Sequence, residues 1–348
     1  MTDLVVSTIY PSDRRGMRRV EALLGSEGIR LDRNLDYTCA IIDDDGAMIA
    51  TGSCFANTLR CLAVDGSHRG EGLLNSIVTH LMEVQSARGN TRVFVYTKEE
   101  ASPMFVDLGF HEVVRAPGSV VFLENRRDGF ASYLRRLETR RIQGRAVSAI
   151  VMNANPFSLG HRYLVEQAAR ASDVVHLFVV SEESSIFPFD VRRRLIAEGT
   201  ADLPNVVLQD TDSYMVSSAT FPSYFQRDEE AAIRGQALLD LTVFTEIARR
   251  LGITRRFVGD EKASFVTRLY NETMASLLPT KGIACVQLRR LEVGGRVVSA
   301  STIRQAIHDR DEELLRSLVP ETTLRLLTSP DAEPIRRAIA ASTDLAHY

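Results

Sequence analysis

After Arg145, short apolar runs alternate with longer segments whose apolar residues recur at helical spacing. The runs predict strands at 147–152, 174–180, 206–208, 256–258 and 283–287. The segments between and after them predict helices at 159–171, 190–198, 227–251, 265–277 and 301–308. Strand–helix alternation of this kind predicts a doubly wound, parallel α/β sheet.

The first 125 residues follow a different pattern, because several strands occur there before any long helix. Strands are predicted at 4–10, 37–42, 48–55, 59–64, 92–96, 109–114 and 120–123, with helices at 73–85 and 101–108. This order predicts a mixed α+β domain with a mostly antiparallel sheet. We therefore expect domains at 1–125 and 146–329, a bridging helix at 126–145, and a tail or terminal helix at 330–348.

Composition excludes several classes of protein. The 42 basic and 45 acidic residues give a formal net charge of −3, and a nucleic-acid-binding protein usually has a basic surplus. The four cysteines show no metal-binding spacing, which favours reduced thiols. The N-terminus lacks signal-peptide character, and no apolar run is long enough to span a bilayer. We expect a cytoplasmic protein without nucleic-acid or membrane partners.

The strongest candidate site follows the first strand of the α/β half. Its sequence is NANPFSLGH, from Asn153 to His161. A helix that begins at the carboxyl end of such a strand presents free N–H groups to phosphate. Gly160 would admit a phosphate close to the backbone, and His161 on the first turn would face it. The alternative is a βα turn in which His161 only caps or packs.

A second candidate lies about 140 residues later, in the sequence VVSASTIR that ends at Arg304. Ser299 and Ser301 stand at a predicted helix start, and Arg304 lies on the same helical face as Ser301. Hydroxyl groups, main-chain N–H groups and a guanidinium together suit triphosphate oxygens. A plain Ser/Thr helix cap is the alternative.

Weaker candidates are spread over both halves. Arg192 is the arginine of an Arg192–Arg194 triplet that we expect to face substrate or phosphate, the alternative being a solvated helix face. Glu261, Tyr270 and Asn271 follow a later strand and could contact substrate or Mg²⁺-bound ATP. In the first half, the glycine loop with Arg69, Gly70 and Gly72 links a strand to a helix.

These motifs carry a resemblance. NPFSLGH resembles the (H/T)-x-G-H motif of nucleotidyltransferases, with Ser158 at the H/T position and Asn155 where many relatives carry Asp. VVSASTIR resembles their I-S-S-T-x-x-R motif. The loop at 69–74 resembles the pyrophosphate loop of acyl-CoA N-acetyltransferases, although Leu74 replaces the usual Gly or Ala. In this order the motifs resemble the citrate lyase ligase family.

The resemblance implies an acid–thiol ligase that uses ATP, with Mg²⁺ carried by the nucleotide and no metal site of the protein alone. Acetate would become an enzyme-bound acetyl-adenylate, with release of pyrophosphate. The acetyl group would then pass to the prosthetic-group thiol of the citrate lyase acyl carrier subunit. His161, Ser158 and Arg304 would be catalytic, and Asn155, Gly160, Ser299 and Ser301 would bind ATP. Two alternatives stay open: a small-molecule nucleotidyltransferase, and an acetyl-CoA-dependent N-acetyltransferase with a nucleotide-sensing domain.

Overall fold

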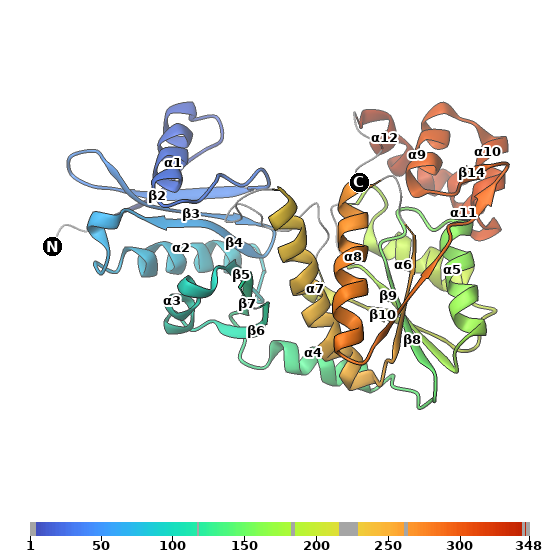
Figure 1. Cartoon of the computed structure of the whole chain (residues 1–348). Coiled ribbons are helices and arrows are strands. Elements are labelled where there is room, and N and C mark those ends of the chain that lie inside the picture. Colours follow the sequence, from blue (N-terminus) through green and yellow to red (C-terminus); the bar gives the residue numbers. More distant parts are fainter. Residues whose placement is uncertain are drawn as a thin grey trace. The chain divides into compact units, whose positions relative to one another are not determined.

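The computed structural model describes residues 5–116, 118–181, 185–215, 229–260, 264–342 and 345. Its contacts divide the chain into two compact units, Met1–Ala131 with Pro222–Thr242, and Ser132–Phe221 with Val243–Tyr348. Each unit contains one large sheet (Figure 1). The fold class predicted from the sequence, a mixed α+β domain followed by a doubly wound parallel sheet, is confirmed.

The first unit contains a seven-stranded sheet in the order β1-β2-β3-β4-β5-β7-β6. Every neighbouring pair is antiparallel except β4 and β5, which pair in parallel across Thr58 and Leu59. Its strands are β1 (Val6–Thr8), β2 (Tyr37–Ile42), β3 (Met48–Phe55), β4 (Thr58–Val64), β5 (Phe94–Thr97), β6 (His111–Ala116) and β7 (Val120–Glu124). Its helices are α1 (Arg14–Ser26), α2 (Leu73–Ala87) and α3 (Ser102–Asp107).

Helix α2 builds the main core of this unit. Its apolar residues Ile77 and Leu81 pack on buried residues of β2, β3 and β4. Gly52 of β3 allows this approach, because a Cβ atom there would lie 2.5 Å from Ile77. The sequence analysis missed α1, whose buried residues Val20 and Leu24 lie outside that cluster.

The second unit contains a five-stranded sheet in the order β10-β9-β8-β11-β12, and all its strands are parallel. The strands are β8 (Val147–Met152), β9 (Val174–Val179), β10 (Val206–Asp210), β11 (Arg255–Gly259) and β12 (Ala284–Leu288). The chain runs outward from β8 to β10 and returns to the other side of β8 for β11 and β12. The switch point of this doubly wound sheet therefore lies between β8 and β11.

Helices cover the parallel sheet on both faces (Figure 1). Helices α5 (Leu159–Arg170) and α6 (Phe189–Gly199) pack on one face with buried Ile150, Val175 and Leu177. Helices α7 (Glu229–Leu251) and α8 (Phe265–Thr280) contact the other face through Phe244 and Tyr270, described below. Helix α4 (Gly129–Glu138) is the shorter form of the predicted bridging helix, and the division of the chain into two units falls within it.

The end of the chain contains more structure than the sequence analysis foresaw. A small hairpin, β13 (Glu292–Val293) and β14 (Arg296–Val297), precedes helix α9 (Ala300–Asp309). Helices α10 (Glu312–Leu318), α11 (Glu321–Thr328) and α12 (Glu333–Ala341) follow. Ile335 and Ile339 of α12 are buried in the same apolar cluster as Ile303 of α9, so residues 333–341 form a packed terminal helix rather than a loose tail. No helix in the described residues is long and apolar enough to cross a membrane.

One close contact tests the packing that positions the loop after β8. Phe157 is fully buried, and a Cβ atom on Gly199 of α6 would lie 2.5 Å from its ring. We expect Gly199→Ala to lower the free energy of unfolding by about 1–3 kcal/mol, because the buried ring must move. Gly25→Ala in α1 is the matched control, since a Cβ atom there meets nothing within 4 Å. The control should be neutral or stabilising by up to about 1 kcal/mol. Urea unfolding curves in which both variants behave alike would contradict this packing.

Candidate active site

The helix α5 begins with a capping box that orients His161. Ser158 is the N-cap, and its Oγ accepts a hydrogen bond from the main-chain N–H of His161 at 3.2 Å. In return, Nδ1 of His161 accepts from the main-chain N–H of Ser158 at 3.1 Å. Because Nδ1 is an acceptor, the proton of the neutral imidazole is carried by Nε2. Capping and function are therefore compatible here, since the cap holds the ring in one orientation.

The ring of His161 stays neutral at physiological pH. Burial, reinforced by the positive charge of Arg290, lowers the pKa of His161 to about 4. The ring also stacks on Phe157, with a centroid distance of 6.0 Å. The Nε2–H group is thus a hydrogen-bond donor of constant charge across the neutral range.

The two motifs found in the sequence meet in space. Arg304, on α9, donates from Nη1 to the main-chain carbonyl of Asn155 at 2.6 Å. A Cβ atom on Gly160 would lie 3.0 Å from the carbonyl oxygen of Val298, so the glycine allows the start of α9 to approach α5. Ser299 caps α9, and its Oγ lies 2.9 Å from Oγ of Ser301. Serine and threonine hydroxyl groups of both helix starts therefore belong to one region.

Arg304 is more buried than the sequence suggested. Its side chain is 2% exposed, and Nε and Nη2 donate to the carbonyl oxygen of Leu345. The guanidinium thus joins the loop after β8 to the end of the chain. Arg304 therefore holds the loop of the candidate site in position through main-chain carbonyl groups.

Asn155 is also buried, but one of its polar atoms has no hydrogen-bond partner in the part of the chain that the structure describes. Its Oδ1 accepts from the main-chain N–H of Phe187 at 3.0 Å. Its Nδ2 is buried and makes no hydrogen bond to any described residue. A buried amide donor without an acceptor is costly, and a ligand oxygen would satisfy it.

Arg192 lies elsewhere than expected. The side chain is fully buried, and it donates to the carbonyl oxygens of Phe187, Asn153 and Val180 at 2.8–3.0 Å. These carbonyl groups belong to the segments that follow β8 and β9. The prediction that Arg192 faces a substrate is not supported by this placement, because its donors hold the two loops together.

The residues that follow β11 divide between two places. Asn271 donates to the carbonyl oxygen of Gly259, at the carboxyl end of β11, at 3.1 Å. The hydroxyl of Tyr270 instead accepts a hydrogen bond from Arg256, in the first half of the same strand. Tyr270 therefore lies away from the carboxyl ends of the strands, where the candidate site is. Glu261 lies outside the described residues.

Arg290 is a site residue that the sequence analysis missed. It follows β12, and its main-chain N–H donates to Oδ1 of Asp260 at 3.0 Å. Its side chain passes over Gly259, where a Cβ atom would lie 3.7 Å from Cγ of the arginine. Its charge acts on His161 as described above. Arg290 comes near His161 only in the folded chain. In the sequence, the one indication of a role was its position after a predicted strand.

The glycine loop of the first unit has the backbone that its sequence predicts. Gly70 and Gly72 adopt φ values of +87° and +78°, and Gly72 is the N-cap of α2 without a side-chain cap. Arg69 is exposed and forms an ion pair with Glu27. Leu74 packs against the core of the unit. The first N–H groups of α2 thus lie next to two glycines that offer no side chain.

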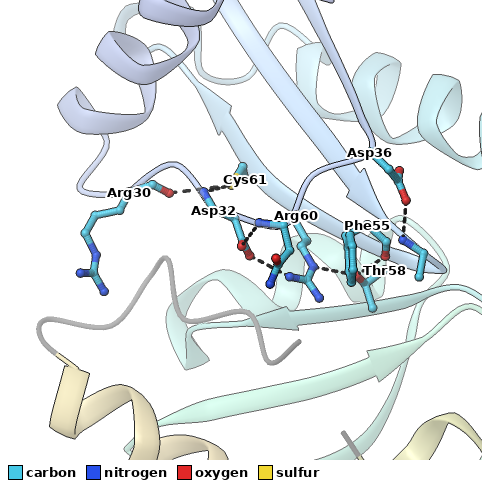
Figure 2. A network of polar contacts seen from close by, with 9 residues as sticks. Arg30, Asp32, Asp36, Phe55, Thr58, Arg60 and Cys61 are labelled. Atoms are coloured by element: carbon cyan, nitrogen blue, oxygen red, sulfur yellow. Dashed lines mark hydrogen bonds and ion pairs between the residues drawn. The ribbon is translucent and has the colours of Figure 1, made fainter. Parts of the chain in front are cut away.

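A buried ion pair lies on the neighbouring strand β4 (Figure 2). Arg60 is 1% exposed, contacts Asp32 at 2.9 Å, and donates from Nε to Thr58 at 2.8 Å. The main-chain N–H of Asp32 also donates to the sulfur of Cys61. These contacts hold the segment before β2 against β4, immediately after the two residues that pair with β5.

The second unit thus belongs to the class of doubly wound α/β proteins. Its helix α5 begins at the switch point of the sheet, where the free N–H groups of a helix N-terminus suit phosphate. Residues 147–327 match the family model described as the citrate lyase ligase C-terminal domain. The chain is 35% identical to the [Citrate [pro-3S]-lyase] ligase of Escherichia coli (strain K12), over 93% of each chain. It is 39% identical to that of Klebsiella pneumoniae, over 86% of this chain and 89% of the relative. The chain belongs to the citrate lyase ligase family, as its motifs predicted.

A solved structure similar to part of the chain is the putative acyl-CoA N-acyltransferase from Klebsiella pneumoniae subsp. pneumoniae MGH 78578. It is 17% identical, with a TM-score of 0.30, and the match covers 35% of this chain and 96% of the other.

The low pKa of His161 yields a prediction about Arg290. We expect Arg290→Gln to raise the pKa of His161 above its value of about 4, because one of the two causes of the shift is removed. Arg289→Gln is the control, since this neighbour is exposed and is not one of the causes of the low pKa. Imidazole ¹⁵N NMR titrations, assigned with His161→Gln, measure the change. Equal titration of His161 in both variants would rule out the proximity of Arg290.

Proposed function

We propose that this protein is an AMP- and pyrophosphate-forming ligase that activates acetate with ATP. An oxygen of acetate attacks the α-phosphorus, the bond to the β-phosphate oxygen breaks, and pyrophosphate leaves. The sulfur of the prosthetic group on the citrate lyase acyl carrier subunit then attacks the acetyl carbon, losing its proton, and AMP leaves. Membership of the family supports this reaction. We place it in the cytoplasm.

One observation carries the proposal: the joining of the two motifs at the switch point of the sheet. Attack on the α-phosphorus places charge on non-bridging oxygens and on the leaving pyrophosphate, so catalysis needs donors in set positions. Nε2–H of His161 supplies one donor, and Nδ2 of Asn155 is a buried donor that lacks an acceptor. The N-terminus of α5, capped by Ser158, supplies main-chain N–H groups.

The remaining residues divide into ligands and supports. Ser299 and Ser301 bind the β- and γ-phosphate end, and Gly160 lets α9 bring them close. Arg304 and Arg192 are positioning residues, because their guanidinium groups bind main-chain carbonyl oxygens. Arg290 adds a cation beside the ring of His161. Asn271, Tyr270 and Glu261 are not assigned a contact with the nucleotide.

Mg²⁺ enters with the nucleotide in this proposal. The described residues contain no group of three potential metal ligands. Phosphate oxygens of ATP and water molecules would supply the ligands of the ion, since Mg²⁺ bound to a nucleotide usually keeps several waters. The ion neutralises charge on the triphosphate.

We propose a division of labour between residues 1–125 and 146–329, with 126–145 as the link and 330–348 as the C-terminal segment. The second part makes the adenylate. The first part docks the dephospho-CoA-type arm, with its phosphates at Arg69, Gly70 and Gly72. In the described residues β4 pairs with β5 only at Thr58 and Leu59, so the rest of β4 has main-chain groups on that side for an extended arm.

The adenylation step is tested by His161→Ala. We expect acetate-dependent ATP–pyrophosphate exchange to fall by roughly 10²–10³-fold, the usual loss for one transition-state donor. His308→Ala, an exposed histidine on α9, is the control and should exchange normally. Exchange that needs no carboxylate would instead indicate a nucleotidyltransferase, and acetyl-CoA turnover without ATP would indicate an acetyltransferase.

The docking role is tested with a pair of substitutions at Gly70. Asp and Asn impose the same strain at a φ of +87°, and no other atom lies within 4 Å of either Cβ. Only Gly70→Asp adds a negative charge beside the proposed phosphate position. We expect its KM for the carrier to exceed that of Gly70→Asn by about 5–30-fold, equivalent to about 1–2 kcal/mol of repulsion. Both variants should retain normal ATP–pyrophosphate exchange. Equal KM values for the two variants would show that the loop is not part of the docking site.

A further inference from the structure

The two faces of the parallel sheet differ in polarity. The face beneath α5 and α6 is mainly apolar, with Ile150, Val175 and Leu177, and its buried Ser148 has a hydroxyl partner in Ser172. The face that contacts α7 and α8 carries His176, Gln209 and Arg256, which are 0%, 1% and 4% exposed. Strands of a parallel sheet that is covered on both faces are usually apolar throughout. Buried polar groups on such a face need partners.

His176 and Arg256 lie in one row of this face, with Ala149 between them. Ala149 of β8 pairs with His176 of β9 on one side and with Arg256 of β11 on the other. Paired residues of neighbouring strands project to the same side of the sheet. The two longer side chains start about 10 Å apart, two strand spacings, and the small side chain of Ala149 occupies little of the space between them.

Among the described residues, neither His176 nor Arg256 finds an acceptor for one of its buried donors. Nδ1 of His176 lies 3.3 Å from Nε2 of Gln209, an amide donor, so Nδ1 accepts and Nε2 of the imidazole carries the proton. That Nε2 is buried and makes no hydrogen bond. Arg256 donates from Nη2 to Tyr270 at 3.1 Å, whereas its Nη1 is buried without a hydrogen bond.

Within the described part of the chain, the charge of Arg256 also has no acidic partner. No carboxylate among the described residues forms an ion pair with it; its guanidinium lies over the rings of Phe244, at 4.3 Å, and Tyr270, at 5.8 Å. Aromatic rings offset only part of the cost of burying a cation. Burial lowers the pKa of His176 to about 4, so the row carries one positive charge at neutral pH and not two.

We propose that a small monovalent inorganic anion, such as chloride, binds between Nε2 of His176 and Nη1 of Arg256 above Ala149. Two N–H donors that lack an acceptor would also suit a water molecule, but a water molecule leaves the guanidinium charge unbalanced. The site is separate from the proposed nucleotide site. Its residues lie within the strands, as the third residue of β9 and the second residue of β11, whereas the nucleotide residues follow the carboxyl ends.

The anion is a structural ligand in this proposal. It would connect β9 and β11 across β8. It would also accept a hydrogen bond from Arg256, whose side chain contacts both α7 and α8. Because it binds only the folded protein, it stabilises that state by mass action. The full chain should therefore melt at a higher temperature in chloride or bromide than in gluconate, which is too large to enter, at equal ionic strength.

We expect Tm to rise by about 5 °C in chloride and to increase further with concentration. Arg256→Met and His176→Phe should lose this anion-specific rise. Arg255→Met is the matched control on the same strand, because Arg255 donates to a carbonyl oxygen near the surface, and it should keep the rise. Equal Tm values in chloride and gluconate for the wild-type chain would overturn the proposal.

Crystals of the unmodified protein grown in bromide give a direct test that does not depend on the variants folding. We expect an anomalous scattering peak within hydrogen-bonding distance of Nε2 of His176 and Nη1 of Arg256. Bromide at surface positions only, or a water molecule without anomalous signal at this position, would refute the anion site. Neither result bears on the adenylation reaction, which is measured separately by exchange.

Discussion

The candidate active site depends on two buried arginines that bind main-chain carbonyl oxygens of one loop. Arg192 donates to the carbonyl of Asn153, and Arg304 donates to the carbonyl of Asn155. These contacts hold the segment between β8 and α5 from two sides, and they set where Ser158 and His161 begin the helix. A neutral carbonyl oxygen satisfies a donor without cancelling its charge, so positive potential persists at the loop. Such potential favours an anionic ligand at the neighbouring helix start.

The strands of the parallel sheet could be predicted because they are buried on both faces. Such strands are continuous apolar runs, and the run at 147–152 coincides with the observed β8. The missed elements lack this signal. Helix α1 begins with RRGMRR, in which Gly16 and four arginines obscure the apolar stripe of Val20 and Leu24. Helices α10 and α11 are short, and their apolar residues are buried because α9 packs beside α10 and α6 packs beside α11.

The site could be predicted only as far as its chemistry is local in sequence. The capping box of α5 joins residues three apart, so the spacing of Ser158 and His161 already contains it. The inward direction of Arg304 is different, because its partners are a carbonyl 149 residues earlier and Leu345 near the end of the chain. The low pKa of His161 is likewise a tertiary property, since packing buries the ring and the pairing of β12 with β11 brings the charge of Arg290 near it.

Only three of the 42 basic residues are lysines, and the buried positions show why arginine matters at several of them. Nη1 and Nε of Arg192 reach three carbonyl oxygens in the two segments that follow β8 and β9. Arg60 combines an ion pair with a hydroxyl contact and a ring contact. A planar guanidinium can make such divergent contacts while fully buried, whereas an ammonium group is a compact, strongly hydrated point charge. At the buried positions, the planar guanidinium connects strands and loops that are distant in sequence. A lysine there would keep the charge but lose these connecting hydrogen bonds.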